Sequence, residues 1–122
     1  MPALGFKCFL VLGILGLLVG CARPPDTLDA IKSGGKLIVV TRNAPTTYYL
    51  GREGPEGYEY SLVSALADSL DVEVEFKVLD SIEGVLAAIE NGEAHLAAAG
   101  ITQTESRKGQ FRFGPDYFSV QQ

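Results

Sequence analysis

The chain has 122 residues, with ten lysines and arginines against fifteen aspartates and glutamates, so its net charge is −5 at neutral pH. This mildly acidic balance argues against nucleic-acid binding, which needs a basic surface. The length suits one small domain with a modest core, and the sequence contains neither an internal repeat nor a low-complexity tract.

The N-terminal residues have the pattern of an export signal. A short basic start precedes an uncharged apolar run of 13 residues, 8–20, whereas a membrane-spanning helix needs about 20. Residues 18–21 (LVGC) resemble the bacterial lipobox, in which the cysteine is lipidated and becomes the new N-terminus. We therefore expect a signal peptide at 1–20 and a lipidated tether at 21–26, attached to a membrane through Cys21. The alternative is an ordinary secretory signal with an incidental cysteine.

The residue after this cysteine is Ala22, not the aspartate that resembles the inner-membrane retention signal of Gram-negative lipoproteins. We therefore expect a periplasmic protein at the inner leaflet of the outer membrane. Cys8 would leave with the signal and Cys21 would carry lipid, so no cysteine would remain for a disulfide or a thiolate metal site. With His95 as the one histidine, we expect no metal and no cofactor, and we interpret His95 as a packed or edge residue.

The first half of the remaining chain predicts a helix, a strand, a loop and a longer helix. Residues 27–33 carry apolar side chains at helical spacing, and two glycines then end the helix. Residues 36–41 are an apolar, β-branched run typical of a buried strand. The glycines and prolines of 42–57 indicate a loop, with a hairpin around Gly51–Gly54. Residues 58–70 predict the longer helix, whose apolar face contains Leu62, Val63, Leu66, Ala67 and Leu70.

The second half continues the alternation. Polar and apolar residues alternate over 71–78, which predicts a half-buried strand. Residues 81–91 predict a helix that ends in a left-handed cap at Gly92; we expect no capping box, because Gly84 stands three residues after Ser81. The remaining elements are predicted as a strand at 94–99, a short helix at 102–110 and a last strand at 111–117.

This order of elements predicts an α/β fold with a mostly parallel sheet flanked by helices and joined by right-handed crossovers. Ligands of such sheets bind outside the carboxyl ends of the strands. In this chain those ends are residues 41–49, 79–81 and 99–102, and we expect the functional site there.

Four segments together resemble the family 3 solute-binding proteins of bacterial ABC transporters. They are residues 35–41 (GKLIVVT), 57–62 (GYEYSL), 100–107 (GITQTESR) and 111–117 (FRFGPDY). The resemblance implies the first lobe of a periplasmic-binding-protein-like, type II fold. It implies that residues 27–122 are an incomplete lobe one, because the second lobe is missing.

A narrower resemblance is to the membrane-bound lytic murein transglycosylase F family. It rests on residues 40–49 (VTRNAPTTYY), 57–60 (GYEY), 96–102 (LAAAGIT) and the tail 114–122 (GPDYFSVQQ). In that family a solute-binding-like domain precedes a lysozyme-like domain, which cleaves peptidoglycan glycan strands and forms 1,6-anhydromuramoyl ends. We expect this chain to be a fragment that lacks the catalytic domain, carries no catalytic residues and only binds or regulates.

Two other functions remain open. One is an amino-acid-binding lipoprotein of an ABC importer, and the other is a structural domain that has lost binding. The resemblances accordingly imply a peptidoglycan fragment or an amino acid as the partner of the site.

Arg107 is the first candidate for ligand binding, because the family's arginine at this turn forks onto the ligand carboxylate through two parallel hydrogen bonds. Thr102 and the backbone near Gly100 lie where the family holds the ligand's main-chain groups. The alternatives are a solvated Arg107 and a capping box from Thr102 to Glu105.

The family also places an aromatic side chain after the first strand, which implies that Tyr48 or Tyr49 stacks on the ligand. The alternative is packing of these rings onto the domain. Thr46 and Asn43 are weaker candidates of the same kind.

Two acidic residues have simpler interpretations. Glu105-Ser106 repeats the Glu-Ser pair of lytic transglycosylases, but the segment that should follow the pair is absent and nothing in the sequence would desolvate Glu105. Glu59 opens a predicted helix and suits its N-terminal dipole.

Overall fold

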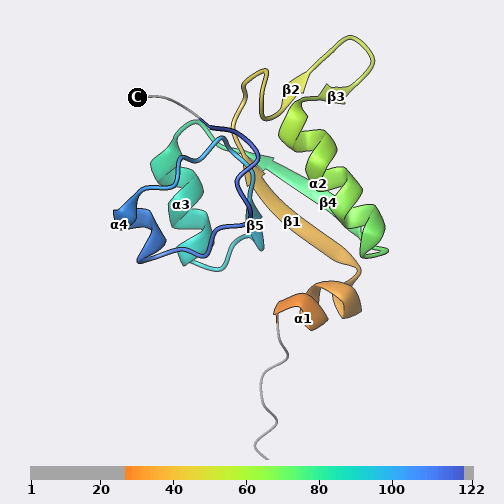
Figure 1. Cartoon of the computed structure of the whole chain (residues 1–122). Coiled ribbons are helices and arrows are strands. Elements are labelled where there is room, and N and C mark those ends of the chain that lie inside the picture. The colour runs from red at the N-terminus through yellow and green to blue at the C-terminus, as the bar shows by residue number, and fades with distance from the viewer. Residues whose placement is uncertain (1–26, 120–122) are drawn as a thin grey trace, which may run out of the picture.

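A three-stranded parallel sheet lies at the centre of the fold (Figure 1). In the computed structural model, which describes residues 27–119, its strands are β1 (Lys36–Thr41), β4 (Glu73–Val78) and β5 (Leu96–Ala97). The order is β4-β1-β5, so β1 is the central strand and pairs in parallel on both sides. The predicted signal peptide, tether and lipidation site lie outside the described residues.

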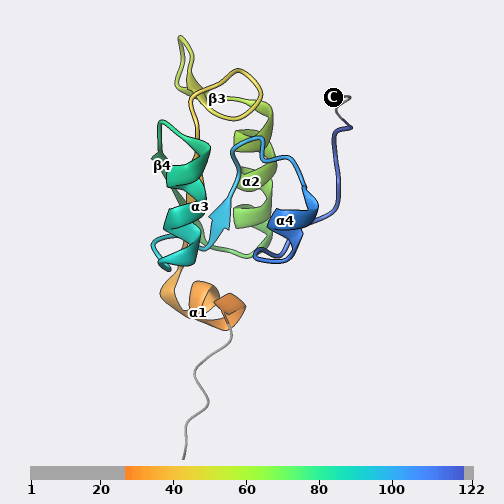
Figure 2. The same ribbon diagram turned by 90° about the vertical axis from the view of Figure 1, so that its left-hand side faces the viewer.

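Two hydrophobic cores form on opposite faces of this sheet because β1 is buried on both sides. Leu37 and Val39 pack with helix α2 (Tyr58–Ser69), whereas Val40 packs with helix α3 (Ile82–Glu90). Figure 2 shows α2 and α3 on either side of the sheet. Alternate residues of one strand therefore belong to different cores, which is the arrangement expected of a doubly wound α/β sheet.

Helix α1 (Thr27–Gly34) precedes β1, and a short hairpin follows β1. The hairpin pairs β2 (Tyr49–Leu50) with β3 (Pro55–Glu56) in antiparallel fashion, which confirms the predicted hairpin around Gly51–Gly54. Within the described part of the chain, no helix is long and apolar enough to cross a membrane.

The termini of α3 follow from local chemistry. Ser81 is the N-cap, and its Oγ accepts a hydrogen bond from the Gly84 N–H at 3.0 Å, so the side chain caps the helix without a capping box. At the other end Gly92 has φ +71°, which confirms the predicted left-handed cap after Asn91.

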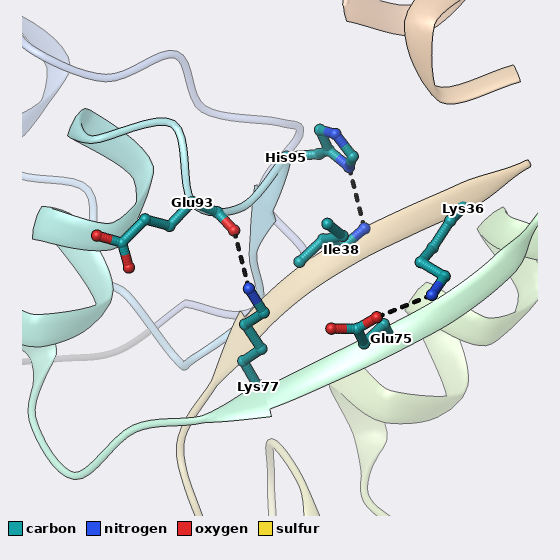
Figure 3. A network of polar contacts seen from close by, with 6 residues as sticks. All are labelled: Lys36, Ile38, Glu75, Lys77, Glu93 and His95. Carbon is teal, nitrogen blue, oxygen red and sulfur yellow. Dashed lines mark hydrogen bonds and ion pairs between the residues drawn. The ribbon is translucent and has the colours of Figure 1, made fainter. Parts of the chain in front are cut away.

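Polar contacts hold the edges of the sheet together (Figure 3). The Ile38 N–H donates to His95 Nδ1 at 3.0 Å, and the His95 N–H donates to the Ile38 carbonyl at 2.9 Å. His95 is therefore an edge residue that extends the pairing of β1 and β5, as the sequence indicated. Beside it, Lys77 Nζ donates to the Glu93 carbonyl at 3.3 Å and joins β4 to the turn after α3.

The predicted last strand is wrong. Residues 111–119 form neither helix nor strand, and the predicted strand at 94–99 is reduced to the two residues of β5. A strand of two residues offers almost no ladder for a further strand, and Pro115 lacks the N–H that a ladder needs. The tail is instead held by side chains, since Gln103 Nε2 donates to Asp116 Oδ1 at 2.5 Å.

Candidate functional site

A groove opens beside the carboxyl end of β5, where the sequence placed the site. Its walls come from α2, from α3, from β5 with the residues on either side of it, and from the tail 111–119. Three predicted site residues, Thr46, Gly100 and Thr102, line this groove. The fold therefore brings together residues that are more than 50 positions apart in the sequence.

Glu59 is the buried acid of this groove. Its side chain is only 5 % exposed, and its two carboxylate oxygens lie 3.2 and 3.0 Å from the Gly100 nitrogen, which donates to them. The Tyr117 hydroxyl donates to the same carboxylate. Burial raises the pKa of Glu59 above its ordinary value of 4.5, and the hydrogen bond from Gly100 partly opposes that rise.

Glu59 lies in the first turn of α2, as predicted. From the sequence we interpreted it only as an acid that compensates the helix dipole, and the buried contacts of the carboxylate were not predicted. The missed signal was periodicity. Glu59, Val63 and Ala67 recur every four residues, and these three are the buried residues of α2. An acid in register with the buried stripe of a helix indicates a polar partner in the interior.

Gly100 turns the chain at the end of β5. Its φ is +64°, a conformation that favours glycine, and a Cβ at this position would lie 3.5 Å from the Thr47 methyl group. The Gly100 turn aims the amide at Glu59 and carries the chain on to Thr102, so the backbone of this segment is part of the site.

Arg107 lies on the short helix α4 (Glu105–Lys108), and its guanidinium donates from Nη1 to the Thr102 carbonyl at 3.1 Å. Arg107 is half-buried, and it forms no ion pair among the described residues. The alternative of a capping box from Thr102 to Glu105 is wrong, because Thr104 is the N-cap and accepts from the Arg107 N–H at 3.2 Å. Thr102 is therefore the acceptor for Arg107 and not the cap of α4.

Tyr48 and Tyr49 lie apart from the groove. The Tyr48 ring packs against Tyr60 and Phe76, with ring centroids 5.8 and 5.4 Å apart. The Tyr49 hydroxyl donates to Glu56 at 2.6 Å within the hairpin. The structure shows the packing alternative for Tyr48, whereas Tyr49 is held within the hairpin, and stacking of either ring on a ligand stays a prediction.

Glu105 has the environment of a surface acid. Its side chain is 92 % exposed and pairs with Lys108 at 3.0 Å, so it lacks the desolvated surroundings of a general acid. Across residues 27–119 no three histidine, cysteine or acidic side chains gather in a way that could hold a metal ion.

The parallel sheet and the motif segments agree with the family pattern. The chain belongs to family 3 of the bacterial extracellular solute-binding proteins, which matches residues 36–122. It is also homologous to the N-terminal part of membrane-bound lytic murein transglycosylase F, as the narrower sequence resemblance predicted.

Two such relatives come from Pseudomonas fluorescens and Vibrio cholerae. The first is 40 % identical over 116 residues, which cover 93 % of this chain and 24 % of the relative. The second is 41 % identical over 115 residues, which cover 91 % of this chain and 22 % of the relative. The chain therefore spans about a quarter of the length of these curated relatives.

Solved structures confirm the predicted lobe-one fold. The arginine-bound form of domain 1 from TmArgBP is 27 % identical, with a TM-score of 0.68 over 74 % of this chain and 72 % of that one. An amino acid ABC transporter substrate-binding protein from Streptococcus pneumoniae, bound to L-arginine, is 34 % identical, with a TM-score of 0.65 over 73 % of this chain and 39 % of that one.

Proposed function

We propose that this lobe binds a small ligand with a free carboxylate at the groove beside β5. The observation that carries the proposal is the hydrogen bond that the Arg107 guanidinium donates to the carbonyl of Thr102. Thr102 lines the groove, whereas Arg107 itself is not one of the lining residues. Thr46 and Gly100 line the same groove, with the Gly100 N–H already bound to Glu59.

The chemistry of arginine supports a carboxylate ligand. A guanidinium has five N–H donors in a planar fork, and the Thr102 carbonyl engages one nitrogen of it. The other donors suit a carboxylate in a bidentate arrangement, which a lysine ammonium does not reproduce. A bond of this type, made to a charged group, contributes about 1.5–3 kcal/mol.

A single lobe is a sensible unit for this function. Domain 1 from TmArgBP, which has the same fold, is described as arginine-bound. In this chain the ligand class is an amino acid or the carboxylate end of a peptidoglycan peptide stem. Tyr48 and Tyr49 follow β1, and we retain them as secondary candidates for ligand contact.

In the whole protein we propose that the lobe is the ligand-sensing module of a murein-degrading lytic transglycosylase. The relatives named membrane-bound lytic murein transglycosylase F support this role. Glycan-strand cleavage to 1,6-anhydromuramoyl ends would then belong to a domain beyond these residues. A lipid on Cys21 would hold the module in the periplasm at the inner leaflet of the outer membrane.

The alternative function is an amino-acid-binding lipoprotein of an ABC importer. It is favoured by the solved structures, since both of the similar chains described above are arginine-bound. The two functions predict different ligands for the same groove.

Calorimetric titration of the chain with L-arginine, other amino acids and a purified muropeptide tests the proposal. We expect binding of a carboxylate ligand, with affinity reduced about 10- to 100-fold in Arg107→Ala, as follows from losing about 1.5–3 kcal/mol. Arg107→Lys should weaken binding as well, because it keeps the charge and loses the fork. Lys108→Ala is the matched control, since Lys108 pairs with the exposed Glu105.

The outcomes separate the functions. Preference for the muropeptide favours the sensing module, and preference for a free amino acid favours the importer lipoprotein. Absence of binding to any of them, or an unchanged affinity in Arg107→Ala, would overturn the proposed site. Purified sacculi incubated with the chain alone should release no 1,6-anhydro products.

A further inference from the structure

Glu59 connects three segments that surround the groove. Its backbone N–H donates to the Thr46 carbonyl at 3.2 Å, which joins α2 to the loop after β1. Its carboxylate accepts from the Gly100 N–H after β5, and from the Tyr117 hydroxyl on the tail. Among the described residues, only Glu59 forms hydrogen bonds to all three segments.

These contacts form a continuous path to the proposed ligand-binding arginine. Glu59 holds the Gly100 amide at the turn of positive φ, two residues before Thr102. The Thr102 carbonyl in turn holds the Arg107 guanidinium. If the Gly100 amide were released, the Thr102 carbonyl would lose its fixed position, and the Arg107 guanidinium would lose the backbone acceptor that orients it.

The burial of Glu59 makes its carboxylate depend on hydrogen bonds from neighbouring groups. Transfer of an ionisable group out of water is costly unless hydrogen bonds offset it. Glu59 is 5 % exposed, and no cation of the described residues pairs with it. Its oxygens therefore depend on the Gly100 amide and the Tyr117 hydroxyl, and those two groups are oriented by it.

We propose that Glu59 is a positioning residue for the ligand site. Through Gly100 and Thr102 it holds the guanidinium of Arg107 in the orientation that receives a ligand carboxylate. This inference rests on the proposed function. It adds a residue that acts on the ligand through Thr102 and Arg107 and not by contacting the ligand itself.

Glu59→Gln in the full chain tests the proposal, with Glu83→Gln as the matched control, because Glu83 is the exposed first-turn acid of α3. The first readout needs no ligand: it is the hydrogen exchange and proton chemical shift of the Gly100 amide by NMR. We expect exchange about tenfold faster and an upfield shift in Glu59→Gln, and no change in Glu83→Gln, because a carboxylate is the stronger acceptor.

The second readout is the affinity for the carboxylate ligand that binds the wild-type chain. We expect about tenfold weaker binding in Glu59→Gln. In the double variant Glu59→Gln/Arg107→Ala the loss of affinity should be smaller than the product of the two single losses, because both residues act through one path. Glu59→Asp, which keeps the charge and shortens the side chain, and Tyr117→Phe, which keeps the carboxylate, should give smaller effects in the same direction.

Each result decides the matter. An unchanged Gly100 amide in Glu59→Gln would overturn the path from Glu59 to Gly100. A changed amide with unchanged affinity would overturn the positioning role and leave the proposed function intact. If no carboxylate ligand binds the wild-type chain, the proposed function fails, and the positioning role fails with it, although the amide readout still reports the hydrogen bond from Gly100 to Glu59.

Discussion

Substitution of Gly57 by alanine should test how closely the loop after β1 packs against α2. Gly57 is the N-cap of α2 and has φ +137°, a conformation that L side chains rarely adopt. A Cβ built there would lie 2.3 Å from the Thr47 carbonyl oxygen and 2.8 Å from its carbon. Both contacts are to backbone, so rotation of a side chain cannot relieve them.

The expected cost has two parts. Backbone strain in this region contributes about 1–3 kcal/mol. The Thr47 carbonyl also accepts the Tyr60 N–H at 2.9 Å, and moving it away from the new methyl group would lose a hydrogen bond that contributes about 1 kcal/mol. We therefore expect Gly57→Ala to lower the free energy of unfolding by about 2–4 kcal/mol.

Two other glycines separate these parts. Gly92 has φ +71° and no atom within 4 Å of a built Cβ, so Gly92→Ala should show strain alone, about 1–2 kcal/mol. Gly34 has neither strain nor contact, and Gly34→Ala should be neutral or stabilising by up to about 1 kcal/mol.

Urea unfolding followed by far-ultraviolet circular dichroism measures all three variants, because the chain has no tryptophan for fluorescence. The expected order of destabilisation is Gly57→Ala, then Gly92→Ala, then Gly34→Ala. If Gly57→Ala is as stable as Gly92→Ala or more stable, the close approach of Gly57 to Thr47 does not exist in solution and the reasoning is refuted.

Three further predictions concern the core, a helix cap and the buried acid. Val85 is fully buried, so Val85→Ala should lower the free energy of unfolding by about 2–3 kcal/mol, because two methyl groups are lost and a cavity is left. Val78 is 44 % exposed, and Val78→Ala should lower it by less than about 1 kcal/mol in the same urea assay. Ser81→Ala should cost about 1 kcal/mol through loss of the cap on α3, and an unchanged unfolding midpoint would contradict that role. Because burial raises the pKa of Glu59, its contribution to stability is present below pH about 4.5 and is lost as the pH rises through the raised pKa. The unfolding free energy of the wild type, minus that of Glu59→Gln, should therefore fall with pH above about 4.5, and a difference that rises with pH would contradict the raised pKa.

Local pattern predicted most of the fold. The runs that became β1, α2, β4 and α3 carry their own periodicity, so their types and approximate limits could be predicted from neighbouring residues. Local pattern could not show whether residues 111–117 form a strand. A strand forms only where another strand offers an edge to pair with, and β5 offers only two residues.

The apolar face of α2 shows a second limit. Leu62 and Leu66 were expected in the core, yet they are 48 and 42 % exposed and line the groove. The buried stripe is narrower, because Val63 and Ala67 share it with Glu59. Hydrophobic periodicity identifies the helix, but the partner that each side chain meets depends on residues far away in the sequence.

The candidate site divides in the same way. Arg107 and Thr102 could be selected from a motif resemblance, and the structure joins them by one hydrogen bond. The contact of Glu59 with Gly100 spans 41 residues, and no local pattern encodes it beyond the position of an acid on a buried stripe.

The packing of the loop after β1 against α2 has a consequence for motion. The Thr46 and Thr47 carbonyls accept the N–H groups of Glu59 and Tyr60, and Gly57 leaves no space between the two segments. The loop and the start of α2 should therefore move as one rigid body. The conformational entropy of this wall of the groove is lost during folding and not during binding, which favours affinity.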